Sequence, residues 1–183
     1  MTSDSIYQTF PELESERYYL RQIIEQDVLD LHEVYSDPRV VQYWGTTPYK
    51  EKEDTLALIT SFTHGFDTQA TIRWGIEDKA TKQVIGTCGY HNWTKGKFRA
   101  EIGYEIKHSE WRKGVMTEVL TMLIPFAFER MSLHRIGALV HPDNQGSKQL
   151  LKKFGFTFEG RLRDYQYVNE EFHDLDMYGL LAP

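Results

Sequence analysis

Between Ile102 and Leu120, a strand-like segment runs directly into a basic turn and then into a helix-like segment. Apolar and polar residues alternate up to Lys107, as they do in a half-buried strand. The basic turn Trp111–Gly114 follows, and a helical pattern of apolar residues opens near Val115. A helix that begins after such a turn directs free backbone N–H groups and its positive end at one point. The stretch therefore predicts an anion-binding site.

The rest of the chain also alternates between strand-like and helix-like segments. Polar turns at residues 78–83 and 94–97 join three consecutive strand-like runs, which we expect to pair as antiparallel hairpins. Thr47 and Pro48 form a helix-start signal, a capping residue followed by proline. The order of elements indicates one mixed α/β domain over residues 1–183, with residues 1–14 as a loose polar leader. We expect strands at 17–21, 71–77, 84–91, 98–107, 136–140, 156–168 and 172–181, and helices at 26–35, from 48, from 115 and at 145–154.

The net charge argues against two classes of partner. The chain carries 21 lysines and arginines against 27 aspartates and glutamates, a net charge of −6. An acidic chain of this kind is poorly suited to bind nucleic acid or an anionic membrane surface. We therefore expect neither as a direct partner, and the acidic balance favours a cationic one.

Cysteine, histidine and apolar residues set further expectations. The one cysteine, Cys88, cannot form an internal disulfide, so we expect a reducing compartment, the cytoplasm. No apolar run approaches the roughly 18 residues of a transmembrane helix. Residues 1–10 lack the basic start and the apolar block of a signal peptide. The histidines show no metal-ligand spacing, so we expect no metal site.

Seven short blocks carry a family resemblance. They are ERYYLR (16–21), SDPRVVQYW (36–44), AEIGYEI (100–106), WRKGVMTE (111–118), HPDNQGS (141–147), KKFGFTFEGRLRD (152–164) and HDLDMYGLL (173–181). Each block alone is weak evidence, but together and in this order they resemble the GNAT N-acetyltransferase superfamily, and within it the RimJ/RimL-type branch. The resemblance implies a single-domain GNAT fold, a mixed and mostly antiparallel sheet of about seven strands flanked by about four helices.

The resemblance also implies that the chain binds acetyl-CoA. In the family, the backbone of the basic turn holds the pyrophosphate, and the residues at that place are Arg112, Lys113, Gly114, Val115, Met116 and Thr117. Met116 replaces a small residue of the family motif, so either its side chain points away from the phosphates or the pocket is tighter. The resemblance further implies that the end of the preceding strand splays away from the next strand. The residues expected to bond the pantetheine arm are Glu105, Ile106, Lys107, Asn144 and Ser147.

Acetyl transfer to an amine needs a group that accepts a proton from the amine and a group that supplies one to the departing thiolate. Glu101 lies on the polar side of its strand and is our candidate general base, although a carboxylate there also suits a structural pair with Arg99. The resemblance places Ser147 near the sulfur as a proton donor, and the same serine suits the first turn of a helix capped by Asn144. Some RimL-like enzymes carry a glutamate where this chain has Gln166, which cannot take a proton.

The acceptor implied by the resemblance is a primary amine, typically the N-terminal amine of a protein or peptide. A polyamine or small-molecule amine is the alternative acceptor, and a catalytically weak CoA-binding module is the alternative function. The branch often forms homodimers. Candidates for the acceptor pocket, for which core packing is the alternative role, are Tyr43, Trp44, Trp74 and Trp93. Further residues that suit either the site or a structural role are Tyr165, Tyr167, His173 and Asp174.

Overall fold

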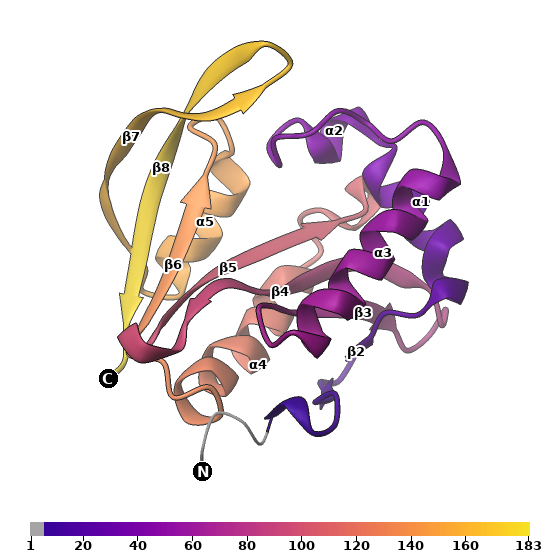
Figure 1. Cartoon of the computed structure of the whole chain (residues 1–183), viewed down its shortest axis with the longest axis horizontal. Coiled ribbons are helices and arrows are strands. Elements are labelled where there is room, and N and C mark those ends of the chain that lie inside the picture. The colour runs from indigo at the N-terminus through magenta and orange to yellow at the C-terminus, as the bar shows by residue number, and fades with distance from the viewer. Residues whose placement is uncertain (1–5) are drawn as a thin grey trace.

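Eight strands form one sheet in the order β1-β2-β3-β4-β5-β6-β8-β7 in the computed structural model, which describes residues 6–183 (Figure 1). Within these residues all neighbouring strands pair antiparallel except β5 and β6, which pair in parallel. The expected mixed, mostly antiparallel sheet is confirmed, with one strand more than expected. The strands are β1 (Leu13–Glu14), β2 (Tyr18–Gln22), β3 (Ile72–Asp78), β4 (Val84–Thr94), β5 (Arg99–Ile106), β6 (Arg135–Val140), β7 (Thr157–Val168) and β8 (Glu171–Leu181).

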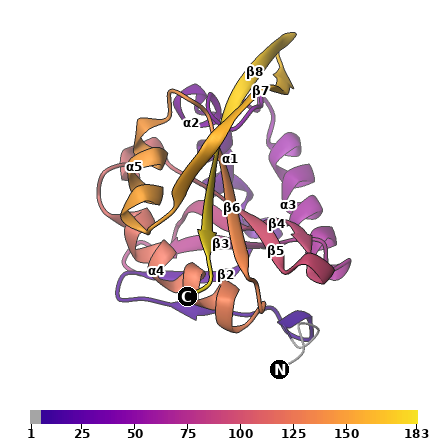
Figure 2. The same cartoon turned by 90° about the vertical axis from the view of Figure 1, so that its left-hand side faces the viewer.

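Helices cover both faces of the sheet. Helices α1 (Val28–Tyr35) and α3 (Lys52–Asp67) lie over one face, and α4 (Val115–Glu129) and α5 (Gln145–Lys153) lie over the opposite face (Figure 2). The short helix α2 (Pro38–Val41) is a fifth α-helix that the pattern did not predict as separate. No helix among the described residues combines the length and the apolar character that a membrane span requires.

Helix α3 begins four residues later than predicted. The expected start at Thr47 and Pro48 is wrong, because the first helical residue is Lys52 and the capping residue is Glu51. The Asp54 carboxylate accepts a hydrogen bond from the Glu51 N–H at 3.2 Å, which satisfies one of the backbone donors at the helix start. A reciprocal capping box therefore sets this helix boundary rather than the proline.

The N-terminal segment packs against the core instead of forming a loose leader. Ile6 is 1% exposed, and the Phe10 ring lies 4.9 Å from the Phe66 ring. The Trp74 indole N–H donates to the Pro11 carbonyl at 2.6 Å. The expectation of a loose leader is therefore wrong for residues 6–14, because their few apolar side chains find partners far along the chain. Residues 1–5 of that leader lie outside the described residues.

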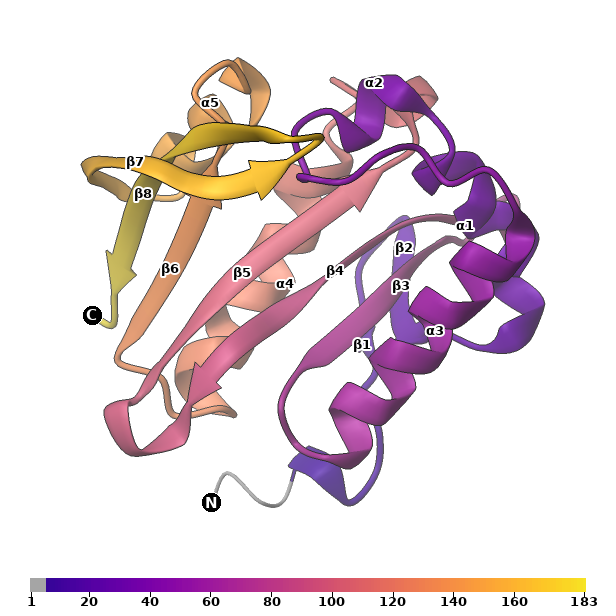
Figure 3. The same cartoon turned by 45° about the horizontal axis from the view of Figure 1, so that its top comes forward.

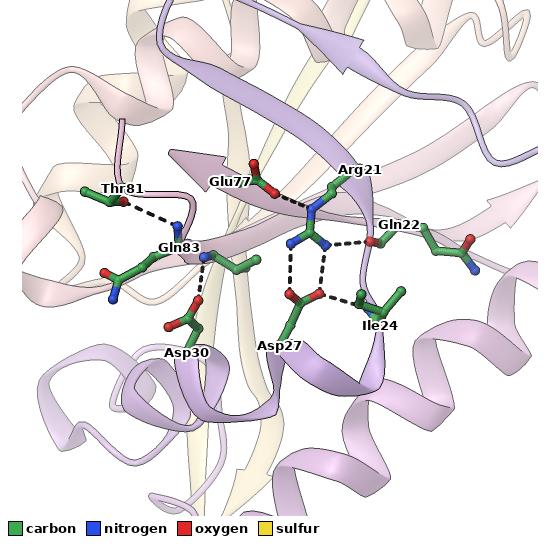
Figure 4. A network of polar contacts seen from close by, with 9 residues as sticks. Arg21, Gln22, Ile24, Asp27, Asp30, Glu77, Thr81 and Gln83 are labelled. Carbon is green, nitrogen blue, oxygen red and sulfur yellow. Dashed lines mark hydrogen bonds and ion pairs between the residues drawn. The ribbon is translucent and has the colours of Figure 1, made fainter. Parts of the chain in front are cut away.

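A charged network fixes the start of α1 against the sheet (Figure 4). Arg21 on β2 donates two hydrogen bonds of 2.8 Å to the Asp27 carboxylate and one of 2.6 Å to Glu77 on β3. Asp27 also accepts from the Ile24 N–H at 2.9 Å. One turn further on, the Asp30 carboxylate accepts from the N–H of the first residue of β4 at 2.8 Å. These bonds hold α1 beside the ends of β3 and β4.

Candidate active site

The pairing between β5 and β6 stops after three residue pairs. Arg99, Ala100 and Glu101 on β5 stand opposite Arg135, Ile136 and Gly137 on β6. Beyond Glu101 the two strands diverge (Figure 3). We call this unpaired stretch, residues 102–106 of β5 and 138–140 of β6, the wedge. The splay that the resemblance implied for the end of β5 is present.

The backbone of β5 directs alternate residues into the wedge. The Lys107 N–H donates to the Ile85 carbonyl at 2.8 Å, so Lys107 points its backbone toward β4. Because backbone groups alternate between the two edges of a strand, Tyr104 and Ile106 point theirs toward the wedge. The Ile106 carbonyl accepts from the Trp111 indole N–H at 3.1 Å. Of the three residues expected to bond a pantetheine arm, Ile106 faces the wedge through its backbone, whereas Glu105 and Lys107 face β4.

The side chains of Glu105 and Lys107 both make contacts on the α1 side of the sheet. The Glu105 carboxylate forms an ion pair with Arg73 on β3 and accepts from the Thr87 hydroxyl at 3.1 Å. Lys107 places its ammonium nitrogen 2.9 Å from a carboxylate oxygen of Glu33 on α1. Both charges are thus neutralised by protein partners outside the wedge.

The basic turn places the N-terminus of α4 next to the wedge. Arg112 and Gly114 have φ angles of +63° and +81°, and Gly114 is the capping residue of the helix. No side chain of residues 6–183 forms a capping hydrogen bond at this end, so the backbone N–H groups of the first turn are available to an external anion. Val115 and Met116 are 1% and 8% exposed in the core, so the Met116 side chain points away from that position. Arg112 and Lys113 are exposed.

A third cation, Arg17, holds this turn in place. Its backbone N–H and its Nε donate to the two carboxylate oxygens of Glu118 in the first turn of α4, at 2.9 Å and 2.7 Å. Its Nη1 donates to the Lys113 carbonyl at 3.3 Å. Sequence reasoning missed Arg17, because its contacts lie about a hundred positions along the chain and no local pattern indicates them. Because its charge is paired with Glu118, the contribution of Arg17 is to fix the backbone of the turn.

Helix α5 brings Ser147 to the other side of the wedge. The Asn144 side chain caps α5 by accepting from the Ser147 N–H at 3.0 Å, so the predicted cap is confirmed. The Ser147 hydroxyl oxygen lies 2.7 Å from the Tyr104 hydroxyl oxygen. Burial raises the pKa of Tyr104 to about 12, so the phenol stays protonated at neutral pH. Nothing in the local sequence pattern around Tyr104 indicates this contact, because Ser147 lies 43 positions along the chain.

Glu101 lies where the wedge begins, on the opposite face of the sheet from Tyr104. Its carboxylate accepts from the Asn92 amide at 3.0 Å and lies 3.5 Å from His91 Nε2. The hydrogen bond from His91 is the main reason that the pKa of Glu101 is lowered, and Asn92 adds to it. The side chain is 21% exposed, so solvent and a substrate can reach it. Its hydrogen-bond partners are thus on β4, and the Arg99 pair that sequence reasoning considered is not the principal contact.

Three chain segments meet beyond the C-terminal end of β6. The Tyr43 ring lies 5.6 Å from the His141 ring, which lies 6.0 Å from the His173 ring on β8. Gln166 on β7 stands opposite His173 and packs its amide against Gly45. The structure therefore brings Tyr43, Gln166 and His173 together at the mouth of the wedge. We call these residues and His141 the mouth cluster.

The other aromatic candidates lie elsewhere. Trp74 is fully buried, and Trp93 stacks on the Tyr7 ring at 5.6 Å, so both are packing residues. Trp44 packs its ring on Tyr35 at 4.9 Å. Tyr165 and Tyr167 on β7 are exposed to solvent. The Asp174 carboxylate accepts from the backbone N–H of a residue in the β7 bulge.

The described residues offer neither a reactive thiol nor a metal-binding cluster. Cys88 is fully buried, and burial raises the pKa of its thiol, which keeps it protonated. No group of three or more His, Cys, Asp or Glu side chains within residues 6–183 could hold a metal ion.

Comparison with known proteins agrees with this geometry. The family model described as "Acetyltransferase (GNAT) domain" matches residues 17–157. The uncharacterized N-acetyltransferase YoaA of Bacillus subtilis is 40% identical over 174 residues, covering 95% of this chain and 98% of that protein. The ribosomal protein uS5-alanine N-acetyltransferase of Escherichia coli is 27% identical, with 93% and 91% covered. A solved structure of the ribosomal-protein acetyltransferase RimL in complex with coenzyme A has a TM-score of 0.82 at 21% identity, with 93% and 98% covered, and shares the fold.

Proposed function

This chain belongs to the acetyltransferase (GNAT) family and is an N-acetyltransferase, and on that premise we propose that it transfers the acetyl group of acetyl-CoA to the N-terminal amine of a protein or peptide. One observation carries the proposal. The strand pairing ends at Glu101 and Gly137, so a wedge opens between an uncapped helix N-terminus and a carboxylate. This arrangement offers an anion site, then a channel lined by β5 backbone groups without a partner on β6, and then a proton acceptor.

The N-terminus of α4 fits the pyrophosphate of CoA. The N–H groups of Val115, Met116 and Thr117 lack a capping side chain. They lie at the positive end of a helix of 15 residues. Arg112 and Lys113 supply full positive charges at the same turn. In this proposal the pantetheine arm follows the wedge and takes the place of a strand partner for the backbone groups of β5 that point toward β6.

The reaction that we propose is direct attack in a ternary complex. The neutral amine forms a C–N bond with the thioester carbonyl carbon, the C–S bond breaks, and the sulfur leaves as a thiolate. The nitrogen releases a proton to Glu101 through a water molecule, and the Ser147 hydroxyl supplies a hydrogen bond to the thiolate. Holding the two substrates together in this geometry supplies much of the acceleration.

Glu101 is ionised at neutral pH and can therefore accept a proton, but its lowered pKa makes it a weak base. Its lowered pKa keeps the carboxylate charged throughout the neutral range. A weak base has little driving force for taking a proton directly from an ammonium ion, and its role is therefore to accept the proton that the attacking amine releases once C–N bond formation makes it acidic. Gln166 lies at the mouth cluster and has no charge to contribute.

A protein N-terminus is the acceptor that two observations support. A relative that acetylates an alanine of a ribosomal protein aligns over 93% of this chain. The chain is acidic, at a net charge of −6, which favours a cationic acceptor. The acidic balance equally suits a polyamine, which remains the second candidate acceptor. The same proposal places the enzyme in the cytoplasm, where protein N-termini and acetyl-CoA meet, and allows it to act as a homodimer.

The test is a thiol-release assay with acetyl-CoA and two sets of acceptors. One set contains short peptides with free N-terminal alanine, serine or methionine, and the other contains spermidine, spermine and small primary amines. N-terminally blocked versions of the same peptides, with a lysine retained, are the matched control. We expect release with free N-termini and none with blocked peptides. Thiol release with polyamines but not with peptides would show that the acceptor is a polyamine and not a protein N-terminus. If calorimetry shows acetyl-CoA binding but neither set of acceptors gives thiol release, the chain is a CoA-binding module and not an active transferase.

A further inference from the structure

A pair of hydroxyl groups connects β5 to α5 beside the wedge. The Tyr104 and Ser147 hydroxyl oxygens are 2.7 Å apart, which is the distance of a good O–H···O hydrogen bond. Ser147 stands in the first turn of α5, where the Asn144 side chain fixes its backbone N–H. Tyr104 comes from the middle of the unpaired part of β5. The pair therefore joins the unpaired part of β5 to the helix that follows β6.

Chemistry decides the direction of this hydrogen bond. A phenol is more acidic than an alcohol and is the better donor, whereas an alcohol oxygen is the better acceptor. Because Tyr104 is protonated at neutral pH, its O–H has a proton to donate. The Ser147 oxygen then has one lone pair occupied by the phenol, and its own proton must point elsewhere. With the phenol as donor, the serine proton points away from the Tyr104 hydroxyl.

We propose that Tyr104 is a positioning residue, which donates to the Ser147 oxygen and thereby aims the Ser147 O–H into the wedge at the sulfur of CoA. The inference rests on the proposed function, since it places the sulfur beside Ser147. It assigns no proton transfer to Tyr104 itself. Donation by the phenol also polarises the serine O–H and strengthens it as a donor, as in any chain of hydrogen bonds.

The contact has a second consequence for the serine rotamer. A serine in the first turn of a helix ordinarily turns its hydroxyl to the solvent or to a nearby backbone group. Tyr104 instead anchors the Ser147 oxygen to β5, and the side chain loses that freedom before any substrate arrives. Removing the phenol hydroxyl should therefore free the serine to rotate, while leaving the aromatic ring in its place.

The test measures the acidity of the CoA thiol on the enzyme, which requires no acceptor. The ultraviolet absorbance of the thiolate is titrated with pH for CoA bound to the wild type, Tyr104→Phe, Ser147→Ala and the double variant. We expect Ser147→Ala to raise the thiol pKa by about one pH unit, since a hydrogen bond to a charged sulfur is lost. We expect Tyr104→Phe to raise it by about half a unit, and to have no effect once Ser147 is alanine.

A matched control comes from another buried tyrosine. The Tyr90 hydroxyl donates to the Leu123 carbonyl at 2.8 Å, away from the wedge. Tyr90→Phe removes one buried hydroxyl in the same way and should leave the thiol pKa unchanged. In turnover, we expect Tyr104→Phe to lower kcat about 3- to 10-fold with the CoA dissociation constant unchanged.

The outcomes separate this inference from the proposed function. If CoA binds and Tyr104→Phe leaves the thiol pKa as in the wild type, the positioning role is wrong while the proposed function stands. Additive effects of the two substitutions would also overturn it, because Tyr104 would then act independently of Ser147. If CoA does not bind to the wild type at all, both the proposed function and this inference fail.

Discussion

Glu101 stands directly opposite Gly137, at the last position where β5 and β6 are paired. A methyl group at Gly137 would lie 3.3 Å from the Glu101 side chain, so the absence of a side chain at Gly137 leaves room for the Glu101 side chain. Strand pairing, the carboxylate and the opening of the wedge thus coincide at one register position. Both the candidate base and the channel depend on where a parallel ladder ends.

Replacing Glu101 tests its role as proton acceptor. We expect Glu101→Gln to lower kcat/KM about 100-fold, which is a typical contribution of a general base. His91 and Asn92 lower the pKa of Glu101, so the carboxylate stays charged as the pH falls to the ordinary glutamate value of about 4.3 and below. The wild-type activity should therefore show no acid limb from this group above pH 5. A matched control is Glu159→Gln, which removes a carboxylate paired with Arg135. An unchanged pH profile and rate in Glu101→Gln would exclude Glu101 as the base.

The turn before α4 can be tested with two equivalent glycines. Gly114 and Gly155 have φ angles of +81° and +83°, and a methyl group at either would meet nothing closer than 3.5 Å. We expect alanine at either position to cost about 1 kcal/mol of stability through the left-handed backbone. Only Gly114→Ala should also weaken CoA binding, by about 10-fold, because it disturbs the N–H groups at the helix start. Calorimetry with CoA and urea denaturation measure the two effects, and equal CoA affinity in both variants would contradict the anion site.

Glu105 provides a test that distinguishes a structural carboxylate from a ligand. Its side chain is 7% exposed and pairs with Arg73, which is 11% exposed. We expect Glu105→Gln to cost about 3–5 kcal/mol of unfolding free energy, because a buried guanidinium would lose its charge partner. CoA affinity should stay unchanged, since the side chain lies outside the wedge. Thermal denaturation and CoA calorimetry on the same sample check this, and a variant of normal stability with weakened CoA binding would assign the side chain to the site.

Asp176 predicts how stability depends on pH. Its carboxylate is 3% exposed and pairs with Arg161 at 2.8 Å and Lys148 at 2.6 Å, and the hydrogen bond from Arg161 is the main cause of its lowered pKa. A lowered folded-state pKa contributes stability above the ordinary aspartate value of about 3.9, and this contribution is lost as the pH falls through the folded-state value. We expect Asp176→Asn to cost about 3 kcal/mol at pH 7 and progressively less below pH 4.

The control for this pH dependence is an exposed aspartate. The Asp143 side chain is 83% exposed, so Asp143→Asn should change stability by less than about 0.5 kcal/mol at every pH. Urea denaturation of the wild type and both variants at a series of pH values gives the comparison. A constant difference between the wild type and Asp176→Asn from pH 3 to pH 8 would show that the cost comes from packing alone.

Local patterns predicted most of the secondary structure. Period-two alternation placed β5 within one residue at each end, and the Asn144 cap and the left-handed Gly155 bounded α5. The start of α3 was missed, because a capping box at Glu51 outweighed a more obvious Thr–Pro signal. Strand alternation and helix caps depend on residues close together in the chain, so the sequence can predict them when competing cap signals are weighed correctly.

The sequence by itself determined the order of elements, the basic turn with its uncapped helix and the family blocks. Only the tertiary structure decided where the parallel ladder stops, that Arg17 holds Glu118, and that Tyr104 meets Ser147. These contacts join residues 36 to 101 positions apart. Their partners are chosen by the packing of whole strands and helices, which no local pattern specifies. The wedge is therefore a property of the folded sheet, because no local pattern in the sequence shows where the two strands stop pairing.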